Sequence, residues 1–321
     1  MNRFLQSISL LFLLCGQVCA QTHSIETQRT VWHDSKRDRD VPVKIYSPKS
    51  GSGPFPVVLF SHGLGGTCEG YEYLGEYWAA HGYVSVHLQH HGSDDAVWRD
   101  TRKLSRMQAM RKSAADPQNA INRPRDISFA IDELERLNRD ASPWQHRLDL
   151  ERIGVAGHSF GAFTTLASAG QVFLPGTAKE GSLADPRIKA AIPMSAPTPK
   201  KRNRLDDVYA GVKVPCLHMT GTKDSSPIGD TTAEERRLPF DHCKNSDQFL
   251  ITFKDGDHMI FSGRTSRSVP SDETFQKLIQ QSSTAFWDAY LRNSSKAKAW
   301  LTNDFKNVLD EAGTFEMKFK R

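Results

Sequence analysis

The chain has 321 residues, of which 38% are hydrophobic and 25% are charged, and its formal net charge is +5. This composition is typical of a globular protein and excludes the fibrous and intrinsically disordered classes. The length allows a sizeable core, and the small basic excess does not indicate a nucleic-acid partner.

The first twenty residues have the features of a secretory signal peptide. A short basic start is followed by a mostly apolar stretch at 4–14 and by the small-residue motif Val18-Cys19-Ala20. The apolar stretch is too short for a membrane anchor, so we expect no stable membrane span. A lipoprotein attached through Cys15 is disfavoured because Leu14 stands where a small residue is expected. We therefore predict cleavage near Ala20 and an exported protein, periplasmic or extracellular.

The remaining residues, 21–321, are predicted to form a single α/β domain. Alternating apolar residues at 30–32 and 41–46 predict a hairpin at the antiparallel edge of a sheet. Short apolar runs predict further strands at 55–60, 83–88, 153–157, 188–194, 212–219 and 249–253. Helical patterns lie between these strands at 70–81 and 127–137 and after the last strand at 275–290. This rhythm predicts a mostly parallel central sheet with helices on both faces, followed by a partly helical tail from Ala297.

Residues 97–119 are predicted to form a helical insertion. Its basic residues recur at helical spacing and could attract an anionic substrate, or they could form a solvated face on a partial lid. Three cysteines, Cys68, Cys216 and Cys243, remain after signal-peptide removal. Their odd number allows one disulfide with one free thiol or three free thiols, and the sequence does not distinguish these.

The segment Gly157-His158-Ser159-Phe160-Gly161 follows a β-branched strand and fits the G-x-S-x-G motif. Glycine at both outer positions suits a strained turn between a strand and a helix, which exposes the serine hydroxyl. Ser159 is thus the candidate nucleophile, and the N–H of Phe160 at the helix start is a candidate oxyanion donor. The motif also occurs in ordinary Gly-Ser turns, so its context has to decide.

Two loops after earlier strands belong to that context. The glycine-rich loop 61–67 allows close approach of backbone N–H groups, and we assign the second oxyanion donor to Leu64, with Gly63 and Gly65 as alternatives. The loop 89–95 contains His90 and His91, which resemble metal ligands. No third ligand at a typical spacing stands out, so a polar loop beside the site is favoured and no metal or cofactor is expected.

An acid and a base follow in the order that a serine hydrolase requires. Asp224 comes directly after one late strand, and His258 follows the last strand. The imidazole would take the serine proton, and the carboxylate would hold the imidazole in the required tautomer. Asp230 and Asp241 lie farther from a strand end, and Asp255 and Asp257 are so close to His258 that they more naturally shape a turn.

These motifs resemble the platelet-activating-factor acetylhydrolase-like branch of the α/β-hydrolases over roughly residues 40–292. They are also similar to bacterial proteins described as predicted dienelactone hydrolases. The resemblance implies an α/β-hydrolase fold, with Ser159 as nucleophile, His258 as base, Asp224 as acid, and Leu64 and Phe160 as oxyanion donors. True dienelactone hydrolases use cysteine where this chain has Ser159, so that substrate name does not transfer.

The sequence therefore predicts an exported serine hydrolase that cleaves a small-molecule, lipid or polymer ester through an acyl-enzyme. A peptidase or acyltransferase with the same triad is an alternative within enzymes, since the triad does not select the leaving group or acceptor. A catalytically silent binding protein on the same scaffold is an alternative from another class. The presence of all the expected catalytic residue types argues against it.

Overall fold

The computed structural model describes residues 22–320 apart from 52, 175, 178–179, 201 and 264–270. The predicted signal peptide at 1–20 lies outside the described residues. Within the described residues, no helix is both long and apolar enough to cross a membrane.

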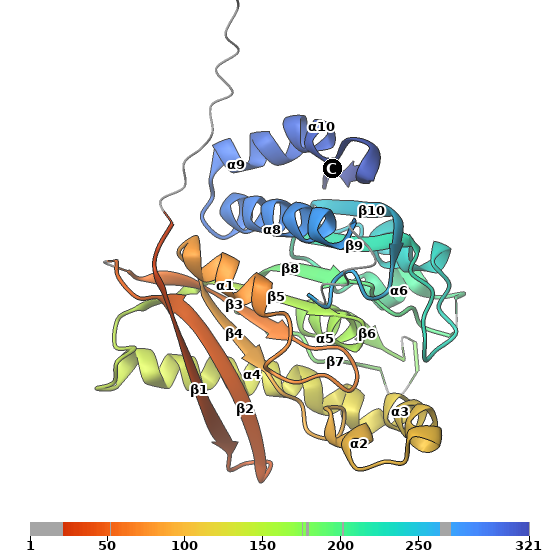
Figure 1. The fold of residues 1–321 in the computed structure, drawn as a ribbon, viewed down its shortest axis with the longest axis horizontal. Coiled ribbons are helices and arrows are strands. Elements are labelled where there is room, and N and C mark those ends of the chain that lie inside the picture. The colour runs from red at the N-terminus through yellow and green to blue at the C-terminus, as the bar shows by residue number, and fades with distance from the viewer. Residues whose placement is uncertain are drawn as a thin grey trace, which may run out of the picture.

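A nine-stranded sheet in the order β1-β2-β4-β3-β5-β8-β9-β10-β11 forms the centre of the fold (Figure 1). Neighbours from β4 to β10 run parallel, and β1, β2 and β11 are antiparallel to their neighbours. The predicted fold class, including the antiparallel N-terminal edge, is confirmed. The strand bounds are β1 (Ile25–Asp34), β2 (Arg39–Pro48), β3 (Phe55–Ser61), β4 (Val84–Leu88), β5 (Leu148–His158), β8 (Ile188–Met194), β9 (Cys216–Lys223), β10 (Gln248–Asp257) and β11 (Gly313–Lys318).

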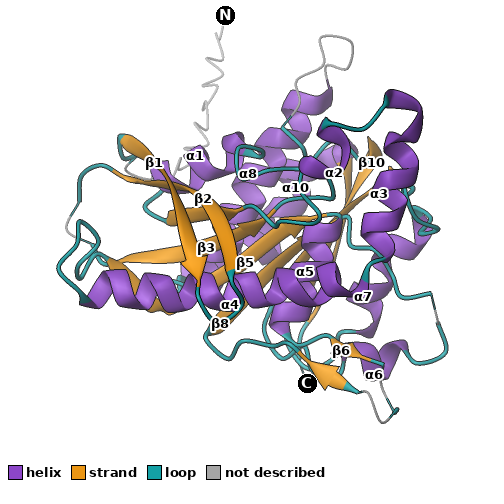
Figure 2. Ribbon diagram, turned by 90° about the horizontal axis from the view of Figure 1, so that it is seen from below, coloured by secondary structure: helices purple, strands orange, loops and turns teal. Residues whose placement is uncertain are grey.

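Helices cover both faces of this sheet (Figures 1 and 2). The apolar residues of α4 and α5 belong to one core cluster, and those of α1 and α8 belong to the other. Among the described residues the α-helices are α1 (Glu72–Ala80), α2 (Ala96–Arg99), α3 (Arg106–Ala115), α4 (Pro117–Arg139), α5 (Phe160–Ala169), α6 (Leu205–Tyr209), α7 (Leu238–His242), α8 (Ser271–Tyr290), α9 (Ser295–Ala299) and α10 (Phe305–Leu309). A small separate ribbon pairs β6 (Val172–Phe173) with β7 (Gly181–Ser182).

The central strands have the burial that their apolar sequences predict. All seven residues of β3 and all five of β4 are buried, because helices pack on both faces of the sheet there.

The local sequence also explains where α4 begins. Asp116 caps it by accepting the N–H of Gln118, and Pro117 occupies the first turn, where its missing N–H costs no hydrogen bond.

Three details differ from the sequence prediction. The helical insertion predicted at 97–119 consists of several pieces, α2, a 3₁₀ turn at Lys103–Ser105 and α3, and α4 already begins at Pro117. The strand expected from Val212 begins only at Cys216, after Pro215, which lacks the N–H that a ladder requires. The tail, expected to be partly helical, also contributes the edge strand β11.

The three cysteines whose pairing the sequence left open are buried, and so is the histidine His218. Cys68, Cys216 and Cys243 are all buried free thiols. His218 on β9 is buried and hydrogen-bonded through Nε2 to Oε1 of Gln248 at 2.8 Å. Burial lowers the pKa of His218 from 6.5 to about 4, so this imidazole is neutral in the native protein at neutral pH.

This buried histidine predicts a pH-dependent stability. Between about pH 6.5 and 4 the unfolded chain binds a proton at His218 that the folded protein excludes, so the free energy of unfolding falls as the pH falls through this window. In His218→Leu the slope of unfolding free energy against pH should be shallower by up to about 1.4 kcal/mol per pH unit. Urea titrations between pH 7 and 4.5 measure the slope. Equal slopes in the two proteins would contradict this account.

Candidate active site

Ser159 lies at the sharp turn between β5 and α5. Its backbone has φ 56° and ψ −116°, a conformation that residues with a side chain rarely adopt. Its own N–H donates to the carbonyl of Met194 on β8 at 2.9 Å, and its carbonyl accepts from Ala162 at 2.9 Å. The turn is therefore held on both sides, and the Ser159 side chain remains partly exposed at the N-terminus of a helix.

The two glycines of this turn are required by the close approach of other backbone. A Cβ on Gly161 would lie 1.9 Å from the carbonyl oxygen of Ser61, at the end of β3. A Cβ on Gly157 would lie 2.5 Å from the carbonyl oxygen of Gly161 and 2.7 Å from that of Ser61. Real Cβ atoms do not make such contacts, so glycine is needed at both positions for the turn to pack against β3.

The structure brings Ser159, His258 and Asp224 together in one hydrogen-bonded chain. Nε2 of His258 lies 3.0 Å from Oγ of Ser159, and Nδ1 of His258 lies 2.7 Å from Oδ1 of Asp224. Asp224 is fully buried, whereas Ser159 is partly exposed. The carboxylate can accept the Nδ1 proton, which leaves the Nε2 lone pair facing the serine hydroxyl.

The competing carboxylates lie elsewhere. Asp241 pairs with Arg237 at 2.9 Å, and Asp230 is exposed with a Lys200 ammonium 4.0 Å away. Asp257 caps the turn that carries His258 by accepting the N–H of Met259 at 2.8 Å. Asp255 pairs at the surface with Lys223 at 2.9 Å.

Sequence reasoning missed three residues that hold Asp224. Oδ2 of Asp224 accepts hydrogen bonds from the hydroxyls of Ser195 and of Thr220, the latter at 2.9 Å. The buried Arg236 donates to the carbonyl oxygens of Asp224 at 3.0 Å and Ser195 at 2.8 Å. Burial lowers the pKa of Arg236, and the neighbouring Asp224 carboxylate opposes that shift.

The backbone amides assigned to the oxyanion hole are distinguished from their neighbours by hydrogen bonding. Gly63 donates its N–H to the Tyr71 hydroxyl at 3.3 Å, and Gly65 donates its N–H to the Ser93 carbonyl at 2.8 Å. For the N–H groups of Leu64 and Phe160, no acceptor occurs within the described part of the chain. Of the three candidates in the loop, Leu64 therefore has the amide that remains available to a ligand.

A buried tyrosine links the loop 61–67 to the elbow, the turn at 157–161 that carries Ser159. The hydroxyl of Tyr71 hydrogen-bonds to Nδ1 of His158 at 2.8 Å while it accepts the Gly63 N–H. Burial holds the pKa of His158 well below 6.5, and the nearby Arg236 guanidinium lowers it further. His158 is thus a neutral neighbour of His258, whose ring centroid is 4.7 Å away.

A substitution at Gly161 tests the backbone contact. Gly161→Ala should lower the free energy of unfolding by roughly 3 kcal/mol or more, because its Cβ would overlap backbone rather than a movable side chain. Gly181→Ala is the matched control: none of the described residues lies within 4 Å of its Cβ position, and the change should stay within about 0.5 kcal/mol. Chemical denaturation measures both. A Gly161→Ala protein as stable as the control would refute the contact.

Comparison with known proteins finds two groups of proteins that are similar to this chain. The family model described as platelet-activating factor acetylhydrolase, isoform II, matches residues 20–103. Platelet-activating factor acetylhydrolase of the guinea pig, Cavia porcellus, is 25% identical over 305 residues, which cover 84% of this chain and 66% of the relative. The dog protein of the same name is 28% identical over 39% of this chain and 34% of the relative.

Cutinases form a second group of relatives. Cutinase 2 of Thermobifida cellulosilytica is 28% identical over 181 residues, which cover 56% of this chain and 52% of the cutinase. The matched part of this chain thus spans between about a third and two thirds of the length of these relatives. The sheet order and the turn at Ser159 are those of an α/β-hydrolase fold, and the chain is similar to the platelet-activating-factor acetylhydrolases and to the cutinases.

Proposed function

We propose that the protein is an exported serine hydrolase that cleaves carboxylic esters through an acyl-enzyme. The observation that carries the proposal is the hydrogen-bonded chain from Ser159 through His258 to Asp224, which begins at a strained, partly exposed turn. The amides of Leu64 and Phe160 lie beside it without intramolecular acceptors in the described part of the chain. This combination provides a nucleophile, a base, an orienting carboxylate and donors for an oxyanion.

In the first half-reaction, Oγ of Ser159 attacks the ester carbonyl carbon while Nε2 of His258 takes the hydroxyl proton. The carbonyl oxygen becomes an oxyanion, and the N–H groups of Leu64 and Phe160 stabilise it. Asp224 stabilises the imidazolium through Nδ1. The bond to the leaving alkoxide then breaks, and His258 returns its proton to the departing alcohol, which leaves the acyl group on Ser159.

In the second half-reaction, water replaces the alcohol. His258 removes a proton from the water, whose oxygen attacks the acyl carbon, and the same amides stabilise the second oxyanion. Collapse of this intermediate releases the carboxylic acid and restores the Ser159 hydroxyl. The hydroxyls of Ser195 and Thr220 and the guanidinium of Arg236 keep Asp224 oriented throughout, because all three contact it in the resting site.

The names of the relatives favour esters over other acyl compounds. Acetylhydrolases and cutinases lie among them, and lipid acetyl esters, short soluble esters and polyesters are the candidate substrates. A peptidase or acyltransferase would use the same residues. Assays with matched amides and with competing alcohols separate these activities, because they change the leaving group or the acceptor and nothing else.

Substitution of the three proposed catalytic residues should lower turnover by different amounts. Ser159→Ala and His258→Ala should each lower kcat on a short-chain p-nitrophenyl ester by about 10⁶, and Asp224→Ala by about 10⁴. Asp230→Ala is the control, since this carboxylate is exposed and far from His258 in the hydrogen-bond network. Fluorophosphonate labelling should modify Ser159 and disappear in Ser159→Ala. Full activity in His258→Ala would refute the mechanism.

Export makes a separate prediction about the N-terminus. Processing near Ala20 should yield a mature chain that begins at Gln21, which intact mass and N-terminal sequencing of protein from the periplasm or medium would detect. Ala20→Tyr should accumulate as the precursor, because a bulky residue replaces the small one at the cleavage site. Recovery of wild-type protein that retains Met1 would contradict the proposal.

A further inference from the structure

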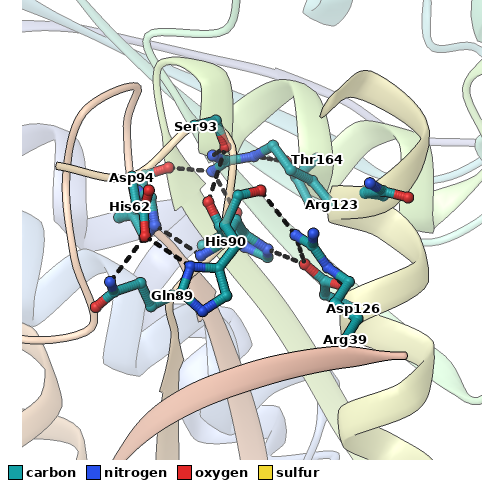
Figure 3. Close-up of polar contacts among 12 residues, drawn as sticks. Arg39, His62, Gln89, His90, Ser93, Asp94, Arg123, Asp126 and Thr164 are labelled. Carbon is teal, nitrogen blue, oxygen red and sulfur yellow. Dashed lines mark hydrogen bonds and ion pairs between the residues drawn. The ribbon is translucent and has the colours of Figure 1, made fainter. Parts of the chain in front are cut away.

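A buried arginine lies directly beneath the two backbone segments of the oxyanion hole. Arg123, on α4, is fully buried. The hydrogen bonds that it donates within the described part of the chain go to neutral oxygens (Figure 3). Its Nε donates to Oγ1 of Thr164 and its Nη1 to Oγ of Ser93, each at 2.8 Å. Its Nη2 donates to Oγ of Ser61 at 2.9 Å and to the carbonyl oxygen of His62. One planar group thus binds three separate segments of the chain.

Two of these segments hold the loop that carries Leu64. The carbonyl of His62, bound by Arg123, lies two residues before Leu64. Ser93, bound through its hydroxyl, accepts the N–H of Gly65 at its own carbonyl. Arg123 therefore fixes the loop on both sides of the Leu64 amide.

The third segment holds the other donor. Thr164, which accepts from Arg123, donates its hydroxyl to the carbonyl of Phe160 at 3.0 Å. The guanidinium of Arg123 also lies over the Phe160 ring, 4.6 Å from its centroid, at a distance where cation–π attraction is favourable. Both donors of the oxyanion hole are thus tied to the same guanidinium.

A relay of hydrogen bonds connects this cation to a buried carboxylate. Oγ of Ser61 lies 2.9 Å from Nε2 of His90, and Nδ1 of His90 lies 2.9 Å from Oδ2 of Asp126. Burial lowers the pKa of His90 to about 4, which keeps the ring neutral. Arg123 can only donate and ionised Asp126 can only accept, so Ser61 donates to Nε2 and Nδ1–H donates to Asp126. Every proton in the relay therefore has one allowed position.

Charge balance explains how an arginine without a carboxylate contact can remain buried. Burial lowers the pKa of Arg123 to about 9, so it is still protonated at neutral pH. Asp126 provides the negative charge at the far end of the relay, where Arg37 and Arg39 also pair with it at 2.8 Å. A buried cation that donates a hydrogen bond from each of its three nitrogens fixes the geometry of its acceptors, because a displacement would leave buried N–H groups without partners.

We propose that Arg123 is a positioning residue that sets the oxyanion hole, by holding the Leu64 and Phe160 amides in fixed relation to each other through Ser93, His62 and Thr164. The proposal rests on the proposed function, since it concerns the transition state of that reaction. Arg123 contacts neither the substrate nor the reacting atoms. Its effect is therefore expected on kcat, which depends on the oxyanion, and not on KM for a small ester.

Arg123→Lys tests this directly, because lysine keeps the charge but cannot span the acceptors of three segments. We expect kcat on a short-chain p-nitrophenyl ester to fall about 100-fold per folded molecule, as for loss of an oxyanion donor, with KM within about threefold. The inhibition constant of an alkyl boronic acid, which forms a tetrahedral adduct with the serine, should rise by the same factor as kcat/KM falls. A kcat within threefold of wild type in folded Arg123→Lys would overturn the proposal.

A matched pair of threonines decides the question if Arg123→Lys does not fold. Thr164 and Thr165 are adjacent on α5, both fully buried, and each donates its hydroxyl to the carbonyl four residues earlier. Only Thr164 also accepts from Arg123. Thr164→Val should lower kcat about tenfold, and Thr165→Val should leave it unchanged while costing similar stability. Equal effects of the two variants on kcat would show that Arg123 serves stability alone.

Measurements on the wild-type protein distinguish failure of the proposed function from failure of the positioning role of Arg123. Wild-type protein without esterase activity or fluorophosphonate labelling would refute the proposed function itself. Wild-type activity that Arg123→Lys and Thr164→Val both retain would refute only the positioning role. Lys44→Met is a further control, since Lys44 is a buried cation that pairs with Glu69 and Glu72, whereas Arg123 donates to Thr164, Ser93, Ser61 and His62. It should lower the melting temperature and leave kcat unchanged.

Discussion

The contact between the elbow and the end of β3 is the constraint on which the site depends. β3 and β5 are parallel neighbours in a register that places Ser61 beside Gly157. Gly161 then lies so close to the Ser61 carbonyl that no side chain fits between them. The candidate nucleophile follows one of these strands, and the loop with Leu64 follows the other. A single backbone contact therefore sets the distance between Ser159 and the amide proposed as oxyanion donor, and acyl transfer through these groups would require that distance to within a fraction of an ångström.

A hydrogen-bonded chain of serine, histidine and aspartate occurs at two places among the described residues, with different consequences. The chain from Ser61 through His90 to Asp126 has distances close to those at Ser159, His258 and Asp224. Ser61 lies in a regular strand, is fully buried, and has its oxygen occupied by Arg123. Ser159 lies on a strained turn and is partly exposed. Exposure and backbone geometry, not the residue types, separate a candidate nucleophile from a structural relay.

The local sequence predicted those parts of the fold and site that depend on local physics. The elbow could be predicted because the close approach of backbone requires glycine at two positions around Ser159. The sheet could be predicted because its buried strands are continuous apolar runs. Asp224 and His258 could be placed because each follows a strand end. The strand β11 was missed, although Phe315 and Met317 alternate with polar residues there, since an edge strand needs only a weak pattern. The insertion was predicted to be helical, but its breaks were not predicted, because charge spacing alone does not define where a helix ends.

The buried cations were missed for a different reason. Arg236 and Arg123 resemble surface charges in a linear reading, because their acceptors come from distant segments and include backbone carbonyls. One signal did exist for Arg123: it precedes Ile127 and Ile131 at spacings of four, and so shares the apolar face of α4. An arginine on such a face must find enough acceptors across the helix to offset its desolvation. In an α/β fold, a helix that covers the sheet beside the nucleophile turn can find those acceptors in the loops at the carboxyl ends of the strands. A charged residue on the apolar face of such a helix is therefore an indication, readable from the sequence, of a residue that supports the site from beneath.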